Sequence, residues 1–209
     1  MKQLLRFRLI ALISVFLTCA LCACSSRITV VEMINEPVKE ELYSVAGSSI
    51  AEVIASIRAG MMSGFAGYGE QKFAAYAGVN VYYEYQADSS LFGDCRVDKI
   101  KITTHPYMKV PQWSSSGSFE ASMLPNWLRY INALRVHEEG HIEIGLASAS
   151  SFASKFTHPN KVQASTCREL DLLIRQIFDA EMVITKQEHL TYDKVTGHGK
   201  TQGTDFTWN

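Results

Sequence analysis

The pentapeptide HEEGH at residues 137–141 constrains this chain more than any other feature. Two histidines four positions apart on an α-helix are separated by only about 40° around the helix axis, so both imidazoles face the same side. A metal ion held between them would leave Glu138 able to activate a water molecule. The pattern predicts a zinc-dependent hydrolase, with His137 and His141 as metal ligands and Glu138 as general base.

The residues around this motif favour a long helix. From residue 123 to about residue 152 the only proline stands near the start, and apolar side chains recur at helical spacing. His137, Glu138 and His141 lie within the apolar stripe. A carboxylate turned towards a core is costly unless it is paired or lies beside a metal ion, so Glu138 is the candidate for catalysis. The alternative is two core histidines satisfied by hydrogen bonds and a glutamate that reaches solvent.

The first 23 residues resemble a bacterial lipoprotein signal peptide. A basic start is followed by an apolar run over residues 9–21, which is short for a membrane span, and by the sequence LCAC ending at Cys24. The resemblance implies cleavage before Cys24 and attachment of lipid to this residue, and several acyl chains anchor a protein firmly. Ser25 follows in place of an aspartate, which implies the outer membrane, facing the periplasm. The alternative is ordinary secretion with a different cleavage site.

The remaining chain has the size of one globular domain with a real core. We divide it into a tether with a first strand, residues 24–40, and a main domain, residues 41–209. Without the three basic residues of the signal segment, 17 Lys and Arg stand against 21 Asp and Glu, a net charge of about −4. Because no basic patch with interleaved aromatic residues is present either, nucleic acid is not expected as a partner.

Two cysteines, Cys95 and Cys167, remain once those of the signal segment and Cys24 are set aside. In an oxidising envelope compartment such an isolated pair is most simply a disulfide, which would restrict the unfolded chain by about 4 kcal/mol. Metal binding by these cysteines is disfavoured because the chain lacks a close Cys pair.

Outside the motif helix, hydrophobic periodicity and turn residues predict the other elements. We expect a strand at residues 27–32 and a helix at 50–59 capped by Ser48 and Ser49. A hairpin of strands around 79–85 and 95–104 should follow, and then a connection that contains Pro106, Pro111 and residues 114–118. We expect a second helix at roughly 161–189 and a loop from Tyr192 onwards. This order predicts an α+β fold, with a small antiparallel sheet packed on the motif helix and the second helix.

A catalytic zinc site usually has three protein ligands and one open position, so the motif histidines require a partner. The metzincin pattern is excluded because Ile144 and Ala147 occupy its glycine and histidine positions. Glu181 on the second helix has the inward-facing phase. His198, which stands between two glycines, could approach a metal ion closely.

The chain also resembles the domain of unknown function 922 family, bacterial proteins predicted to be secreted or periplasmic zinc-dependent proteases with a zincin-like fold. The resemblance rests on VPQW at residues 110–113, NWLRYINALRVHEEGH at 126–141, YDKVTGHGKTQG at 192–203, Cys95 and Cys167. With this resemblance His198 ranks first as third ligand, before Glu181 and Asp193. Tyr192 would polarise the scissile carbonyl or only pack.

These observations lead us to expect an envelope-anchored peptidase that uses Zn²⁺ and acts on a peptide or protein substrate. An extended substrate could lie along an exposed strand of the hairpin. Two alternatives stay open. The chain could be a non-catalytic zinc-binding envelope lipoprotein or assembly factor, with a fourth ligand closing the water position, or an amidase acting on cell-wall peptides.

Overall fold

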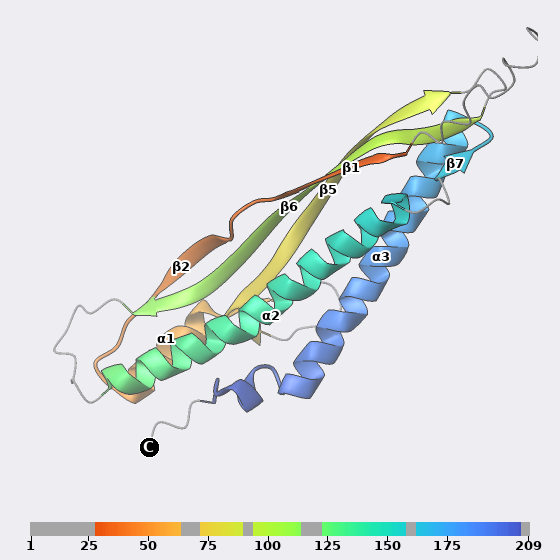
Figure 1. The fold of residues 1–209 in the computed structure, drawn as a ribbon. Helices are drawn as coiled ribbons and strands as arrows, with labels where there is room; N and C mark the ends of the chain where they lie inside the picture. The colour runs from red at the N-terminus through yellow and green to blue at the C-terminus, as the bar shows by residue number, and fades with distance from the viewer. Residues whose placement is uncertain (1–27, 64–71, 90–93, 114–122, 158–161, 206–209) are drawn as a thin grey trace, which may run out of the picture.

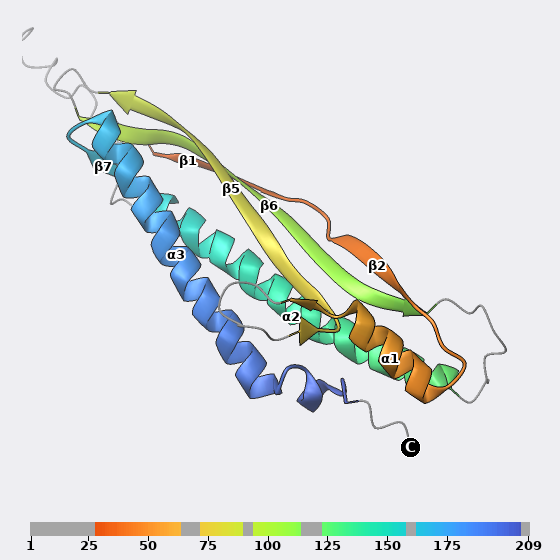
Figure 2. The same cartoon turned by 180° about the vertical axis from the view of Figure 1, so that it is seen from behind.

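The computed structural model describes residues 28–63, 72–89, 94–113, 123–157 and 162–205. Within these residues the chain forms a mixed α/β fold with three α-helices and a five-stranded sheet (Figures 1 and 2). The expected signal peptide, Cys24 and the serine-rich connection lie outside the described residues. None of the described helices is long and apolar enough to cross a membrane.

The five-stranded sheet is built around one long strand, β6 (Cys95–Trp113), which pairs with all the others. β5 (Tyr76–Ser89) and the short β7 (Gln163–Ala164) run antiparallel to it, whereas β1 (Val30–Asn35) and β2 (Lys39–Val45) run parallel to successive parts of it. The expected hairpin is confirmed, but the sheet is mixed rather than antiparallel. A separate two-stranded sheet joins β3 (Met62–Ser63) and β4 (Lys72–Phe73).

β6 continues through two prolines that were expected to end it. Pro106 lies between the part of β6 that pairs with β1, which ends at Thr104, and the part that pairs with β2, which begins at Tyr107. Pro111 lies beyond Lys109, where the pairing with β5 stops. Proline has no N–H, so a strand tolerates it where no neighbouring strand needs that hydrogen bond. At Pro106 the pairing is interrupted on the side of β1 and β2, and at Pro111 it has ended on the side of β5.

The three helices cover one face of the sheet. α1 (Ile50–Gly60) begins at the expected cap, with Ser49 accepting a hydrogen bond from the Glu52 N–H. α2 (Leu124–Thr157) carries the motif and lies along the sheet, and α3 (Cys167–Thr196) runs back beside it in the opposite direction (Figures 1 and 2). A short 3₁₀ helix, η1 (Lys200–Gln202), follows.

α3 is longer than its sequence suggested, because the residues after His189 continue the helix instead of forming a loop. Asp193 and Thr196 are buried, and the helix ends only at Gly197, whose φ of 58° is left-handed. Packing against the neighbouring helix therefore extends a segment that is polar by composition.

Two apolar clusters lie between the sheet and the helices. The first packs α1, β2 and the start of α2, and the second packs β6 and the end of α2 beside the disulfide of Cys95 and Cys167, which is formed as expected. Along α2, His137 to His141 fall within the stretch covered by the first cluster, between Leu134 and Ile142, and the second cluster begins at Ala149. The motif thus lies on α2, which among the described helices has more buried residues than α1 or α3.

Candidate metal centre

α2 turns the three candidate site residues of the motif inwards. His137, Glu138 and His141 are 5%, 3% and 8% exposed, and the exposed Glu139 lies on the other face. The expected orientation of Glu138 is confirmed, and the alternative of a glutamate reaching solvent is wrong.

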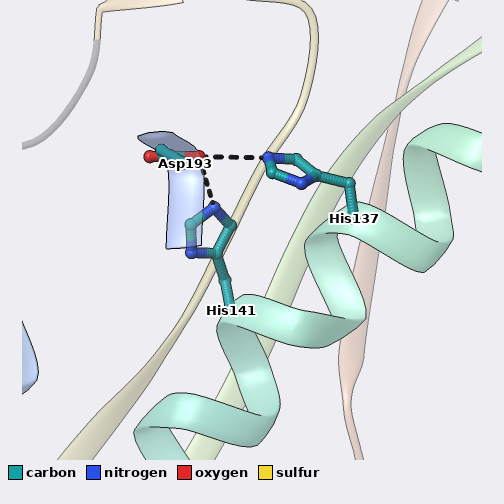
Figure 3. Close-up of side chains that lie close together, drawn as sticks. All are labelled: His137, His141 and Asp193. Carbon is teal, nitrogen blue, oxygen red and sulfur yellow. Dashed lines mark hydrogen bonds and ion pairs between the residues drawn. The ribbon is translucent and has the colours of Figure 1, made fainter. Parts of the chain in front are cut away.

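The last turn of α3 brings Asp193 against both imidazoles. Its Oδ1 lies 3.2 Å from His137 Nε2 and 3.1 Å from His141 Nε2 (Figure 3). Asp193 is itself buried. These three atoms lie within 4.8 Å of one another, and among the described residues they form the one group of three or more His, Cys, Asp or Glu side chains that could hold a metal ion.

The spacing of these atoms fits a zinc ion. Two ligand atoms about 2.1 Å from one ion at a tetrahedral angle lie about 3.4 Å apart. The two nitrogen-to-oxygen distances of 3.2 and 3.1 Å are close to that value. Two imidazoles and one carboxylate are also a usual ligand set for catalytic zinc, which keeps a fourth position open.

Burial sets the protonation of Glu138 in the metal-free protein. Burial raises the pKa of this carboxyl group to about 7, and the charge of Asp193 also raises it. The charge of His137 and a hydrogen bond from the Ala77 N–H lower this pKa, but they do not outweigh the effect of burial. Burial works against protonation of His137, but its bonds to Asp193 and Gln202 and the charge of Glu138 prevail and raise its pKa. A carboxyl group that titrates near neutrality suits a general base.

Each imidazole has a second polar contact on the side away from Asp193. The Nδ1 of His137 lies 3.0 Å from Gln202 Oε1, and the Nδ1 of His141 lies 2.9 Å from His189 Nδ1. Burial, followed by the charge of His141, lowers the pKa of His189 to about 4, so His189 is neutral at pH 7. Both contacts leave the Nε2 atoms directed at Asp193.

Sequence reasoning missed Gln202 and His189 as neighbours of the site. His189 precedes Asp193 by four residues, the spacing that places two side chains on one helix face, so a helix drawn to its true end would have revealed it. No helical spacing in the sequence places Gln202 near the site, because its position depends on the turn that follows α3.

The other residues considered for the site lie outside this ligand group. The ring of His198 is about half exposed, and its Nδ1 is 3.6 Å from Asp193 Oδ1. Glu181 is buried, but it precedes Asp193 by twelve residues, hence by about 18 Å along α3. The sequence ranked both before Asp193, whereas the geometry brings Asp193 to the two Nε2 atoms.

Tyr192 packs behind the histidines. Its ring stacks on His137 with centroids 5.1 Å apart and an interplanar angle of 11°, and its hydroxyl donates to the His137 carbonyl oxygen over 3.2 Å. A Cβ on Gly140 would collide with this hydroxyl, so the glycine of the motif admits the tyrosine. The contacts of Tyr192 therefore support the backbone and ring of His137.

A cleft of about 590 Å³ opens beside the centre. Its walls include His137, His141 and Asp193 together with Glu138, and β5 contributes one side. The lining also includes aromatic side chains and lysines, among them Phe73, Tyr76, Tyr107, Tyr130, Lys72 and Lys186. The buried motif is therefore reached through an open cleft.

Comparison with known proteins gives one family. The family described as "Bacterial protein of unknown function (DUF922)" matches residues 40–199, which is 160 of the 209 residues. The matched region contains the whole motif and Asp193. No curated protein and no solved structure gives a significant match.

Proposed function

The chain belongs to the DUF922 family of bacterial proteins of unknown function, and we propose that it is a zinc-dependent peptidase of the zincin-like type. One observation carries the proposal. His137 Nε2, His141 Nε2 and Asp193 Oδ1 converge at metal-ligand spacing beside the buried carboxyl group of Glu138.

The residues of the centre divide into ligands and a base. His137, His141 and Asp193 hold the metal ion. A zinc ion bound there supplies Lewis acidity, which lowers the pKa of water and polarises a peptide carbonyl group. Glu138 takes the proton from the attacking water and delivers it to the leaving amine, a task for which a pKa near 7 is well matched.

We assign the third ligand to Asp193 in preference to His198. The Asp193 carboxylate is buried and touches both Nε2 atoms, whereas His198 is about half exposed and reaches only the carboxylate. His198 lines the cleft, which supports a role in contacting substrate.

The substrate is a peptide in extended form. β5 contributes a wall of the cleft, and in the described part of the chain no strand pairs with the edge of β5 that faces away from β6. Extended peptides bind to such edges by main-chain hydrogen bonds. The signal-like N-terminus supports attachment to the envelope membrane through lipid on Cys24.

Replacing the base tests catalysis separately from metal binding. Glu138→Gln should keep stoichiometric zinc and a native fold while hydrolysis of casein falls by several orders of magnitude. Glu139→Gln, an exposed neighbour on the same helix, is the matched control and should keep full activity. Loss of zinc from the Glu138 variant, or retained hydrolysis, would contradict the assigned role.

The ligand assignment has its own test. Asp193→Ala should abolish zinc binding measured by metal analysis after dialysis, whereas His198→Ala should retain it. If only the His198 variant loses zinc, the assignment to Asp193 is wrong.

A non-catalytic zinc protein is the second candidate, and the position of His198 favours it. With its Nδ1 3.6 Å from Asp193 Oδ1, His198 stands close enough for a small movement to make it a fourth ligand, which would close the water position. In that case wild-type protein binds zinc but hydrolyses neither casein nor cell-wall peptides. Activity on the cell-wall peptides alone would identify an amidase instead.

A further inference from the structure

We propose that Gln202 is a positioning residue of the metal centre, which together with Tyr192 holds His137 in the tautomer that presents an unprotonated Nε2 to the metal ion. The proposal rests on the metal site proposed above, and three hydrogen bonds around His137 carry it.

The first bond fixes the proton of Tyr192. The Tyr192 Oη lies 3.2 Å from the backbone carbonyl oxygen of His137. A carbonyl oxygen can only accept, so the single hydroxyl proton of Tyr192 points to it. The Tyr192 oxygen is left as an acceptor for any further partner.

The second bond fixes the side-chain amide of Gln202. Its Nε2 lies 3.0 Å from Tyr192 Oη. Because this oxygen has already used its proton, the group facing it must donate, and only the NH₂ end of the amide does so. The two ends of a glutamine amide are assigned from such networks, and here the network admits one orientation.

The third bond then fixes His137. The Oε1 of Gln202 faces the Nδ1 of His137 at 3.0 Å and can only accept, so Nδ1 carries a proton. The neutral imidazole therefore has its lone pair on Nε2, the atom that lies 3.2 Å from Asp193 Oδ1. A lone pair directed at a carboxylate is repelled, so either a proton or a metal ion lies between Nε2 and Oδ1; when the metal ion replaces the proton, Nδ1 keeps its own proton through Gln202.

The turn after α3 brings Gln202 back beside His137. Gly197, His198 and Gly199 have φ values of 58°, 55° and 81°, so three successive residues take the left-handed conformation that favours glycine. A Cβ on Gly199 would lie 3.1 Å from the Cγ of His137, so the backbone of the turn packs directly on the imidazole. The TGHG segment thus serves the centre by its backbone as well as through His198.

Zinc affinity, measured by competition with a chelator, tests the role of Gln202. Gln202→Leu keeps the size of the side chain but removes the acceptor, and we expect about 10-fold to 100-fold weaker binding. Gln202→Glu keeps an acceptor opposite Nδ1 and should retain most of the affinity. Gln187→Leu, an exposed position on α3, is the matched control and should bind zinc as the wild type does.

Tyr192→Phe provides a second probe that leaves Gln202 in place. Loss of the hydroxyl frees the amide to rotate, so zinc affinity should fall in the same direction, and the visible spectrum of the Co²⁺-loaded protein should change. Thermal unfolding of each metal-free variant shows whether the fold is retained.

Two results would overturn the role of Gln202. One is a Gln202→Leu variant that binds zinc as tightly as wild type. The other is equal weakening by Leu and Glu at this position, which would mean that packing and not the acceptor matters. Wild-type protein that binds no zinc would defeat the proposed peptidase as well, whereas tight binding without hydrolysis would defeat the peptidase alone.

Discussion

The buried carboxyl group of Glu138 makes the stability of the metal-free protein depend on pH in a defined way. Its pKa is about 7 in the fold against 4.5 as the ordinary value. Between these values the folded state binds more protons than the unfolded state, so this group's contribution to stability is present below pH 4.5 and is lost as the pH rises towards 7. Glu138→Gln removes that loss, because a glutamine keeps the shape and carries no charge.

The size of the effect follows from the interval between the two pKa values. At about 1.4 kcal/mol per pH unit, an interval from 4.5 to about 7 amounts to about 3 kcal/mol. The difference in unfolding free energy between Glu138→Gln and wild type should therefore grow by about 3 kcal/mol in favour of the variant between pH 4.5 and pH 8. His137 is present in both proteins, but the charge of Glu138 that raises its pKa is lost in the variant, so part of the difference comes from His137.

Urea denaturation in the presence of EDTA, repeated across this pH range, measures the difference. Glu139→Gln removes an exposed carboxyl group from the adjacent position and should leave the difference nearly flat. A flat profile for Glu138→Gln would refute the reasoning, because it would mean that the carboxyl group is as well solvated in the fold as in the unfolded chain.

Three further predictions concern the fold and its metal. Replacing both Cys95 and Cys167 by serine opens a loop spanning 72 positions and should lower the unfolding free energy in urea by about 4 kcal/mol; an unchanged value would contradict the constraint. Gly140→Ala places a methyl group against the Tyr192 hydroxyl and should cost about 1–3 kcal/mol in thermal unfolding, whereas a fully stable variant would show that the contact is loose. Zn²⁺ at one hundred times its Kd should stabilise the protein by about 2.7 kcal/mol, reversibly with EDTA, and no shift would argue against a site in the folded state.

Much of the fold was accessible from local pattern. Ser49 and the following apolar residues predicted α1, the alternation from Val79 to Tyr85 predicted β5, and the Cys95–Cys167 bridge followed from the cysteine count. The parallel pairing of β1 and β2 with β6 was not accessible, because it depends on contacts between residues about 70 positions apart. β6 was cut short for the same reason, since only its partners show that Pro106 is tolerated.

The candidate site divides in the same way. The i, i+4 spacing of His137 and His141 placed two imidazoles on one face without knowledge of the rest of the chain. Asp193 was ranked below His198 on the family resemblance, and the segment that carries Asp193 was read as a loop. The helix continues through Asp193 because tertiary packing stabilises it, which turns its carboxylate to the histidines.

X-ray absorption spectroscopy of the zinc-loaded protein, with metal content measured on the same sample, tests the metal centre most directly. We expect one zinc ion per chain, bound by two imidazole nitrogens and one carboxylate oxygen at about 2.0–2.2 Å with one further light atom from water. Asp193→Ala should remove the ion, and His198→Ala should leave the spectrum unchanged. A folded protein that binds no zinc, or a spectrum with three imidazoles that loses one in His198→Ala, would contradict the proposed centre.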